Sequence, residues 1–217
     1  MPFWTAFSPQ ASPPNVAAAL YWFDTMYQGS RFAYLYAVAT DLRFRSRGFC
    51  HKLMSDTHAH LAGLGYAGTL LLPASASLRD FYAAMGYSAF STIREFPCSA
   101  AEPTLTLRQI SHEEYAHLRR QYLPENGVMQ EGTMLAFLQT YAAFYEGVNC
   151  LFTTIRDGET LFVPELLGDA ATAPGILQTL GFSCGSFRTP GGDKPFAMCR
   201  SLTGAQIPAG YFGLALD

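Results

Sequence analysis

Three arginines stand at alternate positions in the short stretch RFRSRGFCHK, at Arg43, Arg45 and Arg47, and Gly48 follows them directly. The chain holds 14 Lys and Arg residues among 217, so this local density of positive charge is unusual for it. A guanidinium group presents a planar fork of donors that matches phosphate oxygens. A glycine at the start of a helix lets unpaired backbone N–H groups approach the same anion closely. The pattern therefore predicts a diphosphate site, and the alternative is an ordinary helix start with solvated arginines.

The elements that would position this loop are a strand before it and a helix after it. Residues 32–40 (FAYLYAVAT) are apolar, aromatic and β-branched, as in a buried strand, and residues 50–65 carry apolar side chains at a helical period. A second buried strand, GTLLLP, follows, and then a short helix at 77–87 whose Ser77 fits a capping signature. Strand, helix, strand and helix in this order predict a parallel strand pair with a right-handed crossover.

The stretch from Arg45 to Cys50 (RSRGFC) resembles the R/Q-x-x-G-x-[GA] loop of the GNAT (GCN5-related) N-acetyltransferase superfamily. The preceding strand and the later LRDFYAAMGY are similar to the flanking elements of that family, so the resemblance spans roughly residues 32–87. Three positions depart from the family pattern: Leu42 stands where proline is common, Ser46 where glycine is common, and Cys50 where glycine or alanine is found. The resemblance implies an α/β fold with a mixed α+β sheet, a GNAT-like acyl-CoA-binding fold, and acetyl-CoA as co-substrate without a metal.

The resemblance also implies a role for each part of the loop. Backbone N–H groups of residues 47–51 would bind the diphosphate, with Arg45 and Arg47 flanking it. If the loop is extended, Arg43 lies on the same side and reaches the adenosine 3′-phosphate. The pantetheine arm would pair with strand residues 37–39, where a backbone amide would polarise the thioester oxygen. The acetyl-CoA contacts implied in this way are Ala37, Val38, Ala39, Arg43, Arg45, Ser46, Arg47, Gly48, Phe49, Cys50, His51, Ser77 and Tyr82.

Tyr82 is the implied catalytic residue. A tyrosine with a pKa of about 10 keeps its proton at neutral pH and could give it to the departing thiolate. The alternative is a tyrosine at the edge of the core whose hydroxyl is satisfied there. Ser77, similarly, is either a CoA contact or simply the cap of its helix. As general base the chain offers these side chains or termini: Glu95, His112, Glu113, Glu114 and the C-terminal carboxylate of Asp217.

Two lobes are expected. The segment PCSAAEP predicts a linker at 98–103, between a partial acyl-CoA-binding domain at 1–97 and a second GNAT-like lobe at 104–217. About 31 residues precede the strand at 32–40, enough for one strand (FWTAF) and one helix (NVAAALYWF), so the front of the first domain looks shortened. A sheet edge left open by the short front would favour a homodimer.

The second lobe reads as a strand at 104–110, helices at 111–123 and 131–147, a hairpin turning at Asp157 and Gly158, a short helix at 173–182, and strands around 196–202. It lacks an R-x-x-G-x-[GA] loop. We therefore expect a degenerate GNAT-like lobe without CoA that supports the first sheet and shapes the acceptor site.

Composition and the remaining motifs argue against several other functions. A net charge of −3 argues against nucleic acid and anionic membranes as partners, and neither a bilayer-spanning apolar run nor a signal-peptide pattern is present. Five widely spaced cysteines without a C-x-x-C pair indicate reduced thiols and a cytoplasmic location. The two histidines of HEEYAH are five residues apart and those of HAH are two apart, so neither pair can bind one metal from the same helix face. GFSCG fits the pattern around a hydrolase serine nucleophile, but no histidine follows it to act as the base. RTPGGDK is expected to be a hairpin or a surface turn.

Two classes of function follow. The first is an N-acetyltransferase that moves an acetyl group from acetyl-CoA to an amine of an unknown small molecule or peptide, by direct attack in a ternary complex. The second is a non-catalytic CoA-binding or scaffold protein derived from such an enzyme, an alternative favoured by the shortened front and by the departures at Leu42 and Cys50.

Overall fold

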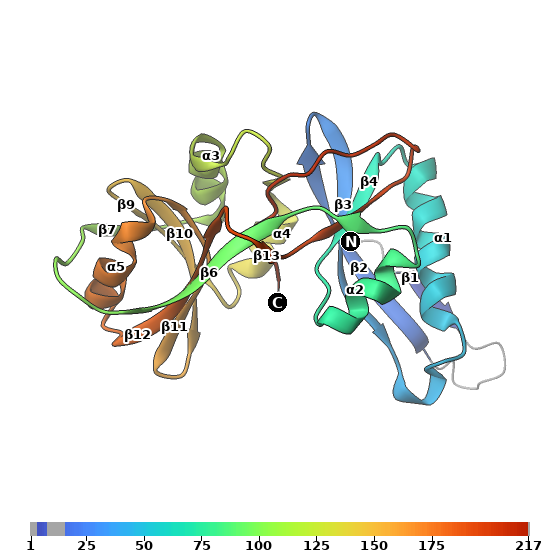
Figure 1. Ribbon diagram of the computed structural model, residues 1–217, viewed down its shortest axis with the longest axis horizontal. Helices are drawn as coiled ribbons and strands as arrows, with labels where there is room; N and C mark the ends of the chain where they lie inside the picture. The colour runs from blue at the N-terminus through green and yellow to red at the C-terminus, as the bar shows by residue number, and fades with distance from the viewer. Residues whose placement is uncertain (1–3, 8–15, 217) are drawn as a thin grey trace. The chain divides into compact units, whose positions relative to one another are not determined.

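The computed structural model describes residues 4–7 and 16–216, with side chains from residue 16 onward. The chain divides into two compact units (Figure 1). The first unit is Met1–Ala89 together with Ala197–Pro208, and the second is Phe90–Phe196 together with Ala209–Asp217. No helix in the described part of the chain combines the length and apolar character that crossing a bilayer requires.

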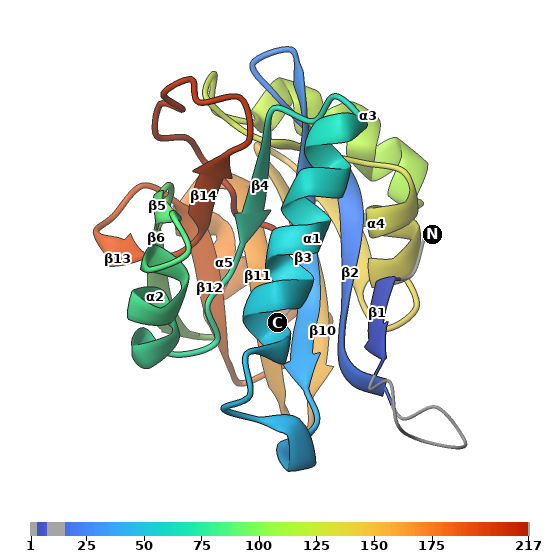
Figure 2. The same ribbon diagram turned by 90° about the vertical axis from the view of Figure 1, so that its right-hand side faces the viewer.

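In its described residues the first unit is a mixed sheet with strand order β1-β2-β3-β4-β14-β5, together with two α-helices and one 3₁₀ helix. β3 and β4 are parallel, as predicted, and the other neighbouring pairs are antiparallel. α1 connects β3 to β4 and covers one face of the sheet (Figure 2). The elements are β1 (Trp4–Phe7), β2 (Val16–Tyr27), β3 (Ser30–Thr40), the 3₁₀ helix η1 (Leu42–Phe44), α1 (Phe49–Gly63), β4 (Gly68–Leu71), α2 (Ala76–Ala83), β5 (Ser88–Ala89) and β14 (Met198–Ser201).

The prediction of a helix at NVAAALYWF is wrong, because residues 16–23 of this segment are part of β2. β2 and β3 form a hairpin with a two-residue loop, in which Gln28 and Gly29 both have positive φ angles, 48° and 74°. This geometry matches the twist of two antiparallel strands. Alanine favours a helix locally, but pairing with β1 on one side and β3 on the other overrides that weak preference.

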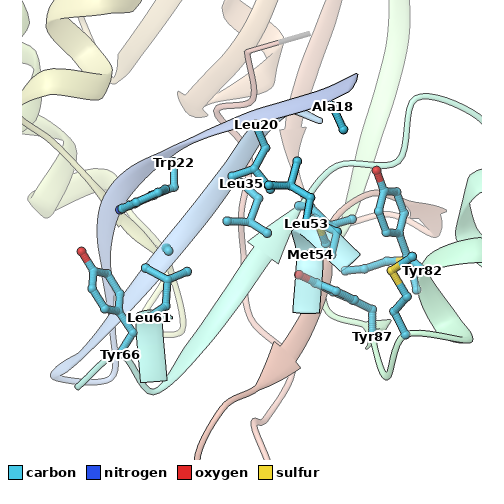
Figure 3. Close-up of a cluster of buried hydrophobic side chains, with 14 residues drawn as sticks. Ala18, Leu20, Trp22, Leu35, Leu53, Met54, Leu61, Tyr66, Tyr82 and Tyr87 are labelled. Atoms are coloured by element: carbon cyan, nitrogen blue, oxygen red, sulfur yellow. The ribbon is translucent and has the colours of Figure 1, made fainter. Parts of the chain in front are cut away.

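The core of the first unit lies between α1 and the sheet. Leu53, Met54 and Leu61 project from α1 onto apolar side chains of β2 and β3, and Tyr82 and Tyr87 lie side by side at one end of the cluster (Figure 3). Burying each large apolar side chain contributes roughly 1.5–3 kcal/mol. The helix period and the strand residues that predict this core are confirmed.

The second unit is another mixed sheet, with strand order β13-β6-β12-β11-β10-β9-β7. β11 and β12 are parallel and are connected through α5, while the other neighbouring pairs are antiparallel. The elements are β6 (Thr92–Ser99), β7 (Leu107–Ile110), α3 (His112–Tyr122), β8 (Met129–Gln130), α4 (Thr133–Leu138), β9 (Ala143–Gly147), β10 (Cys150–Asp157), β11 (Thr160–Gly168), η2 (Ala170–Thr172), α5 (Ala173–Leu180), β12 (Cys184–Pro190) and β13 (Lys194–Pro195).

One expectation for the second lobe needs correction. The predicted long helix at 131–147 ends at Leu138, because its apolar second half becomes β9 and pairs with β7 and β10. RTPGGDK contains an exposed turn at residues 191–193, between the end of β12 and the start of β13. The hairpin at Asp157 is confirmed, with Asp157 opposite Thr160.

The boundary between the units also differs from the expected one. The predicted linker at 98–103 does not separate them, since β6 runs through Ser99 and pairs with β12, and the division falls after Ala89. The strand predicted around 196–202 exists as β14 but lies beside β4 in the first sheet (Figure 2). The predicted domain bounds, 1–97 and 104–217, are therefore wrong in one further respect, because residues 197–208 return to the first unit.

A buried ion pair lies in the core of the second unit. Arg119 of α3 is 2% exposed and Glu165 of β11 is fully buried, and two N–H groups of Arg119 donate to the carboxylate at 2.7 and 2.8 Å. The hydroxyls of Tyr115 and Tyr211 donate to the same carboxylate at 2.8 and 3.0 Å. These contacts connect α3 and β11 to the chain segment around Tyr211.

Candidate functional site

The arginine-rich loop between β3 and α1 is not extended. It contains the 3₁₀ helix η1, and Ser46 and Gly48 have left-handed backbone angles with φ of 58° and 78°. The premise of an extended loop is therefore wrong, and alternation along the sequence, which holds only in extended backbone, no longer predicts a common side for Arg43, Arg45 and Arg47. α1 starts at Phe49, immediately after Gly48, as predicted.

A run of six backbone N–H groups in this loop has no acceptor. Within the described residues, no group accepts a hydrogen bond from the N–H groups of residues 46–51. The first intrahelical bond of α1 runs from the N–H of Lys52 to the carbonyl of Gly48 at 2.9 Å, and no side chain caps the helix. Bare amides in left-handed turns and at a helix N-terminus form a concave positive site that suits an anion such as phosphate.

These residues border a cavity of about 560 Å³. Most of its lining comes from the end of β3, the loop and the start of α1, and one side comes from α2. The lining residues are Val38, Ala39, Thr40, Phe44, Arg45, Ser46, Gly48, Phe49, Cys50, His51, Leu78, Phe81 and Tyr82.

The strand edge beside the cavity is open. β3 pairs with β4 from Phe32 to Leu35, and then continues to Thr40 while β4 ends at Leu71. Among the described strands none pairs with residues 36–40 on that side. Ala37 has a positive φ of 51°, at an irregularity in the pairing with β2. A left-handed angle at a residue other than glycine costs roughly 1–2 kcal/mol, and such strain concentrates at functional positions.

Tyr82 lies in the last turn of α2 and borders the cavity. Its ring is 6% exposed and packs edge-on against the rings of Phe81 and Tyr87, at centroid distances of 5.3 and 5.8 Å. No described group forms a hydrogen bond with its hydroxyl. Burial, and secondarily Cys50 nearby, raises the pKa of Tyr82 to about 12, so the hydroxyl keeps its proton throughout the neutral range. Tyr82 is thus a weaker acid than the ordinary tyrosine expected from the sequence.

Cys50 borders the cavity in the first turn of α1. Burial raises the pKa of its thiol above the ordinary value, which outweighs a hydrogen bond with Thr40. Cys50 is therefore a neutral, small side chain at neutral pH, and its thiol adds no negative charge beside the bare amides.

The arginines of the loop have different surroundings. Arg45 borders the cavity, and its Nε donates to the carbonyl of Thr40 at 3.3 Å. Arg43 does not border it; its guanidinium donates twice to Asp41, at 3.0 and 2.8 Å, and these bonds hold the pKa of Asp41 down to about 2. Arg47 is exposed, with its guanidinium 5.8 Å from the ring centroid of Phe44.

Two further predicted site residues do not line the cavity either, namely Ala37 and Ser77. Ser77 is also not the cap of its helix, because α2 begins at Ala76 and Ser75 takes the N-cap position. Conversely, the sequence-based prediction missed four residues that do line the cavity: Thr40, Phe44, Leu78 and Phe81. The helical period of α2, which puts Leu78, Phe81 and Tyr82 on one face, is the signal that could have found two of them.

The side chains considered as a general base lie in the second unit and do not line this cavity. Glu95 binds Arg188 and Lys194 at 2.8 and 2.7 Å, and Glu114 lies 2.7 Å from Arg108. Asp217 lies outside the described residues. In the part of the chain that the structure describes, no group of three His, Cys, Asp or Glu side chains could hold a metal ion.

In the second unit the corresponding helix start, at α5, is covered. Asp169 precedes η2 and its carboxylate accepts from the N–H of Ala171 at 2.9 Å. Residues 101–105 pack over the first turn of α5, where an added Cβ on Gly175 would lie 2.6 Å from the carbonyl oxygen of Pro103. The approach to α5 thus has a carboxylate on the N–H of Ala171 in η2 and a segment packed over Gly175, although no side chain caps α5 itself.

Comparison with known proteins identifies the fold. The sequence matches no family model and no curated protein. Solved structures are similar in fold: a GCN5-related N-acetyltransferase from Kribbella flavida shares 16% identity at a TM-score of 0.61, over 87% of this chain and 58% of that one. Eis1 from Mycobacterium abscessus shares 13% identity at a TM-score of 0.64, over 91% and 63%. A tandem GNAT protein from the clavulanic acid biosynthesis pathway shares 11% identity at 0.54, over 90% and 82%.

The chain therefore has the GNAT fold, with two lobes as in tandem GNAT proteins. The fold expected from RSRGFC and LRDFYAAMGY is confirmed. The chain spans about three-fifths of the length of the Kribbella flavida and Mycobacterium abscessus proteins, at 58% and 63%.

Proposed function

We propose that the first unit binds acetyl-CoA and transfers its acetyl group to an amine of a small molecule or peptide. The observation that carries this proposal is the run of unpaired N–H groups at residues 46–51, which borders a cavity of about 560 Å³. Acetyl-CoA supplies the acetyl group as a reactive thioester. The fit rests on three features of this chain: bare amides for a diphosphate, an open strand edge for an extended amide-containing arm, and a protonated hydroxyl beside both.

Each feature has a role in the proposal. The amides of Gly48, Phe49, Cys50 and His51, with the guanidinium of Arg45, hold the diphosphate. Each exposed contact of this kind contributes roughly 0.3–1 kcal/mol, so affinity comes from several acting together. The backbone of residues 37–39 aligns the pantetheine arm, and an amide near Val38 polarises the carbonyl to be attacked.

Tyr82 is the proposed proton donor to the departing thiolate. Its hydroxyl is protonated at neutral pH and makes no competing hydrogen bond within the described structure. The amine attacks directly while both substrates are bound: the C–N bond forms, the C–S bond of the thioester breaks, and the thiolate takes the proton of Tyr82. Solvent water accepts the proton that the amine loses and returns one to Tyr82, so the chain forms no covalent intermediate. Glu95, His112, Glu113 and Glu114 do not line the cavity, and we assign none of them as general base.

We further propose that the second unit holds no CoA, since Asp169 caps the short helix η2 before α5 and residues 101–105 pack over the first turn of α5. One CoA is then bound per chain. The five cysteines are free, which supports a reducing, cytoplasmic location. A homodimer through an edge of the first sheet stays a prediction.

Calorimetry with acetyl-CoA, followed by release of free thiol in the presence of a panel of amines, tests the proposal. We expect binding at one site per chain and thiol release with at least one amine. Tyr82→Phe should lower turnover about 10²-fold or more and leave CoA affinity unchanged, whereas Tyr141→Phe in the second unit should change neither. No binding of acetyl-CoA would contradict the proposal.

One observation favours the alternative, a CoA-binding protein without catalysis. Burial destabilises the phenolate form of Tyr82, and this weaker acidity lowers its capacity to protonate a thiolate. Binding at one site without thiol release for any amine would support this alternative.

A further inference from the structure

Arg200 is contributed to the first unit by β14, the strand that the chain adds after it has passed through the second unit. It lies opposite Thr69 of β4, and Met198, two residues earlier on the same face, belongs to the core under α1. The guanidinium Nη1 donates to the carbonyl of Met85 at 2.6 Å and lies 3.1 Å from Nδ1 of His58. One arginine thus contacts both α1 and the end of α2.

The contact with Met85 fixes the C-terminal turn of α2. The carbonyl of Tyr82 accepts from the N–H groups of Met85 and Tyr87, at 2.9 and 3.2 Å. The chain then turns through Gly86, whose φ is 86°, and the guanidinium lies against this turn. A cation at this position also interacts favourably with the negative end of the helix dipole. Arg200 therefore holds the turn that begins at Tyr82.

The contact with His58 starts a buried chain of hydrogen bonds. A guanidinium can only donate, so Nδ1 of His58 accepts and the neutral ring carries its proton on Nε2. That proton is donated to the hydroxyl of Tyr87 at 2.8 Å. The Tyr87 hydroxyl also forms a hydrogen bond with Oγ1 of Thr69 at 2.8 Å, in which either oxygen can be the donor. The ring of Tyr87 is thereby held at its hydroxyl from two sides.

Tyr87 is the ring against which Tyr82 packs, with the centroids 5.8 Å apart and the planes at 65° (Figure 3). The Tyr82 hydroxyl has no hydrogen bond within the described structure, so its position depends on this packing and on the turn of α2. We infer that Arg200 is a positioning residue for Tyr82, acting through the end of α2 and through His58 and Tyr87. The inference rests on the proposed role of Tyr82 as proton donor.

A purely structural role for Arg200 makes a different prediction. If Arg200 only stabilises the first unit, its loss lowers activity by the same factor whether or not Tyr82 has a hydroxyl. If Arg200 positions that hydroxyl, its loss has no further effect once the hydroxyl is gone, because the two changes act on one step.

The experiment is a double-mutant cycle in full-length protein, measured with acetyl-CoA and a responsive amine. We expect Arg200→Met to lower kcat roughly tenfold or more, with the KM for acetyl-CoA changed less than about twofold, since small displacements of a reacting group cost much in rate. Arg200→Lys keeps a donor for Met85 and should stay within about threefold of wild type. In a Tyr82→Phe background, Arg200→Met should change kcat less than about twofold. Arg31→Met, a charge removal elsewhere in the first unit, should leave kcat unchanged.

A second variant covers the case in which Arg200→Met does not fold. Tyr87→Phe removes one hydroxyl and keeps the ring, and we expect it to lower kcat roughly fivefold, again with no further effect in the Tyr82→Phe background. NMR of protein labelled at the tyrosine ζ-carbon gives a readout without turnover. The Tyr82 signal, assigned by its loss in Tyr82→Phe, should shift in Arg200→Met or Tyr87→Phe and not in Arg31→Met.

Equal losses from Arg200→Met in both backgrounds, or an unmoved Tyr82 signal in both Arg200→Met and Tyr87→Phe, would overturn the inference. A different result identifies failure of the proposed function. If Tyr82→Phe alone leaves kcat unchanged, Tyr82 is not the proton donor, whatever Arg200 does to the Tyr82 signal.

Discussion

Replacing Gly48 by Asp would put a carboxylate at the start of α1, beside the unpaired N–H groups of residues 46–51. The side chain has room, since a Cβ built at Gly48 meets nothing within 4 Å. The backbone there is left-handed, with φ of 78°, and Asp and Asn are the side chains that tolerate this region best. Gly48→Asn is therefore the matched control, with the same shape and strain but no charge.

The magnitude follows from Coulomb's law. A carboxylate about 4 Å from one phosphate charge costs about 1 kcal/mol in water and several times more where water is partly excluded. Against the two charges of a bound diphosphate, even the aqueous value gives about 2 kcal/mol, or roughly 30-fold in affinity. On stability the same charge acts in the opposite direction, because it favours the helix N-terminus by about 0.3–1 kcal/mol.

Calorimetry with CoA and urea unfolding of both variants make the comparison. We expect Gly48→Asp to bind CoA at least about 30-fold more weakly than Gly48→Asn, and to be equally or slightly more stable. Added salt should narrow the difference in affinity. Equal CoA affinity of the two variants would refute the idea that these amides hold a diphosphate.

Three further predictions concern other residues. Arg45→Gln should weaken CoA binding about tenfold in calorimetry, because a hydrogen bond to a charged group contributes about 1.5 kcal/mol. Arg47 lies outside the cavity lining, so Arg47→Gln should change the CoA affinity less than about twofold. Burial, and secondarily Arg200, lowers the pKa of His58 to about 4. Below about pH 6.5 the unfolded state therefore binds a proton on this histidine that the folded state does not bind. The free energy of unfolding then falls on acidification by about 1.4 kcal/mol per pH unit. Urea unfolding at pH 6.5 and 5.0 should show a loss of about 1.5 kcal/mol in the wild type, since the unfolded histidine is already half protonated at pH 6.5, and less than half of that loss in His58→Gln. An equal loss in both proteins would contradict this assignment. Glu165→Gln leaves Arg119 as an uncompensated buried charge and should cost about 3–5 kcal/mol in urea unfolding of the second unit, while a loss below about 1 kcal/mol would mean that the pair is not buried as described.

Local signals predicted the part of the fold that carries the candidate site. The apolar β-branched run of β3, the glycine before α1 and the helical period of α1 each depend on residues close in sequence, and all three are confirmed. The loop residues predicted from RSRGFC largely line one cavity, because a helix start and its preceding turn are determined locally.

Long-range pairing accounts for what the sequence did not reveal. The alanine-rich start of β2 favours a helix by itself, and only its two neighbouring strands make it extended. Likewise nothing near Met198 indicates that β14 returns to the first sheet, since its partner Leu71 lies far away in the sequence. The prediction for Arg43 missed a neighbour two residues away, because Asp41 pairs with it only in the turn that η1 forms.

The return of β14 to the first sheet has a consequence for synthesis of the protein on the ribosome. The first ninety or so residues emerge early, but β4 gains its second neighbour only when residues 198–201 have left the exit tunnel. Until then β4 presents an unpaired edge to other nascent chains, and such an edge favours aggregation. The second unit is by that time largely translated, so β14 closes the first sheet only after most of the second unit has been made. Separate expression of residues 1–89 should for the same reason yield a product that depends on chaperones, and co-expression with a peptide carrying β14 should restore its solubility.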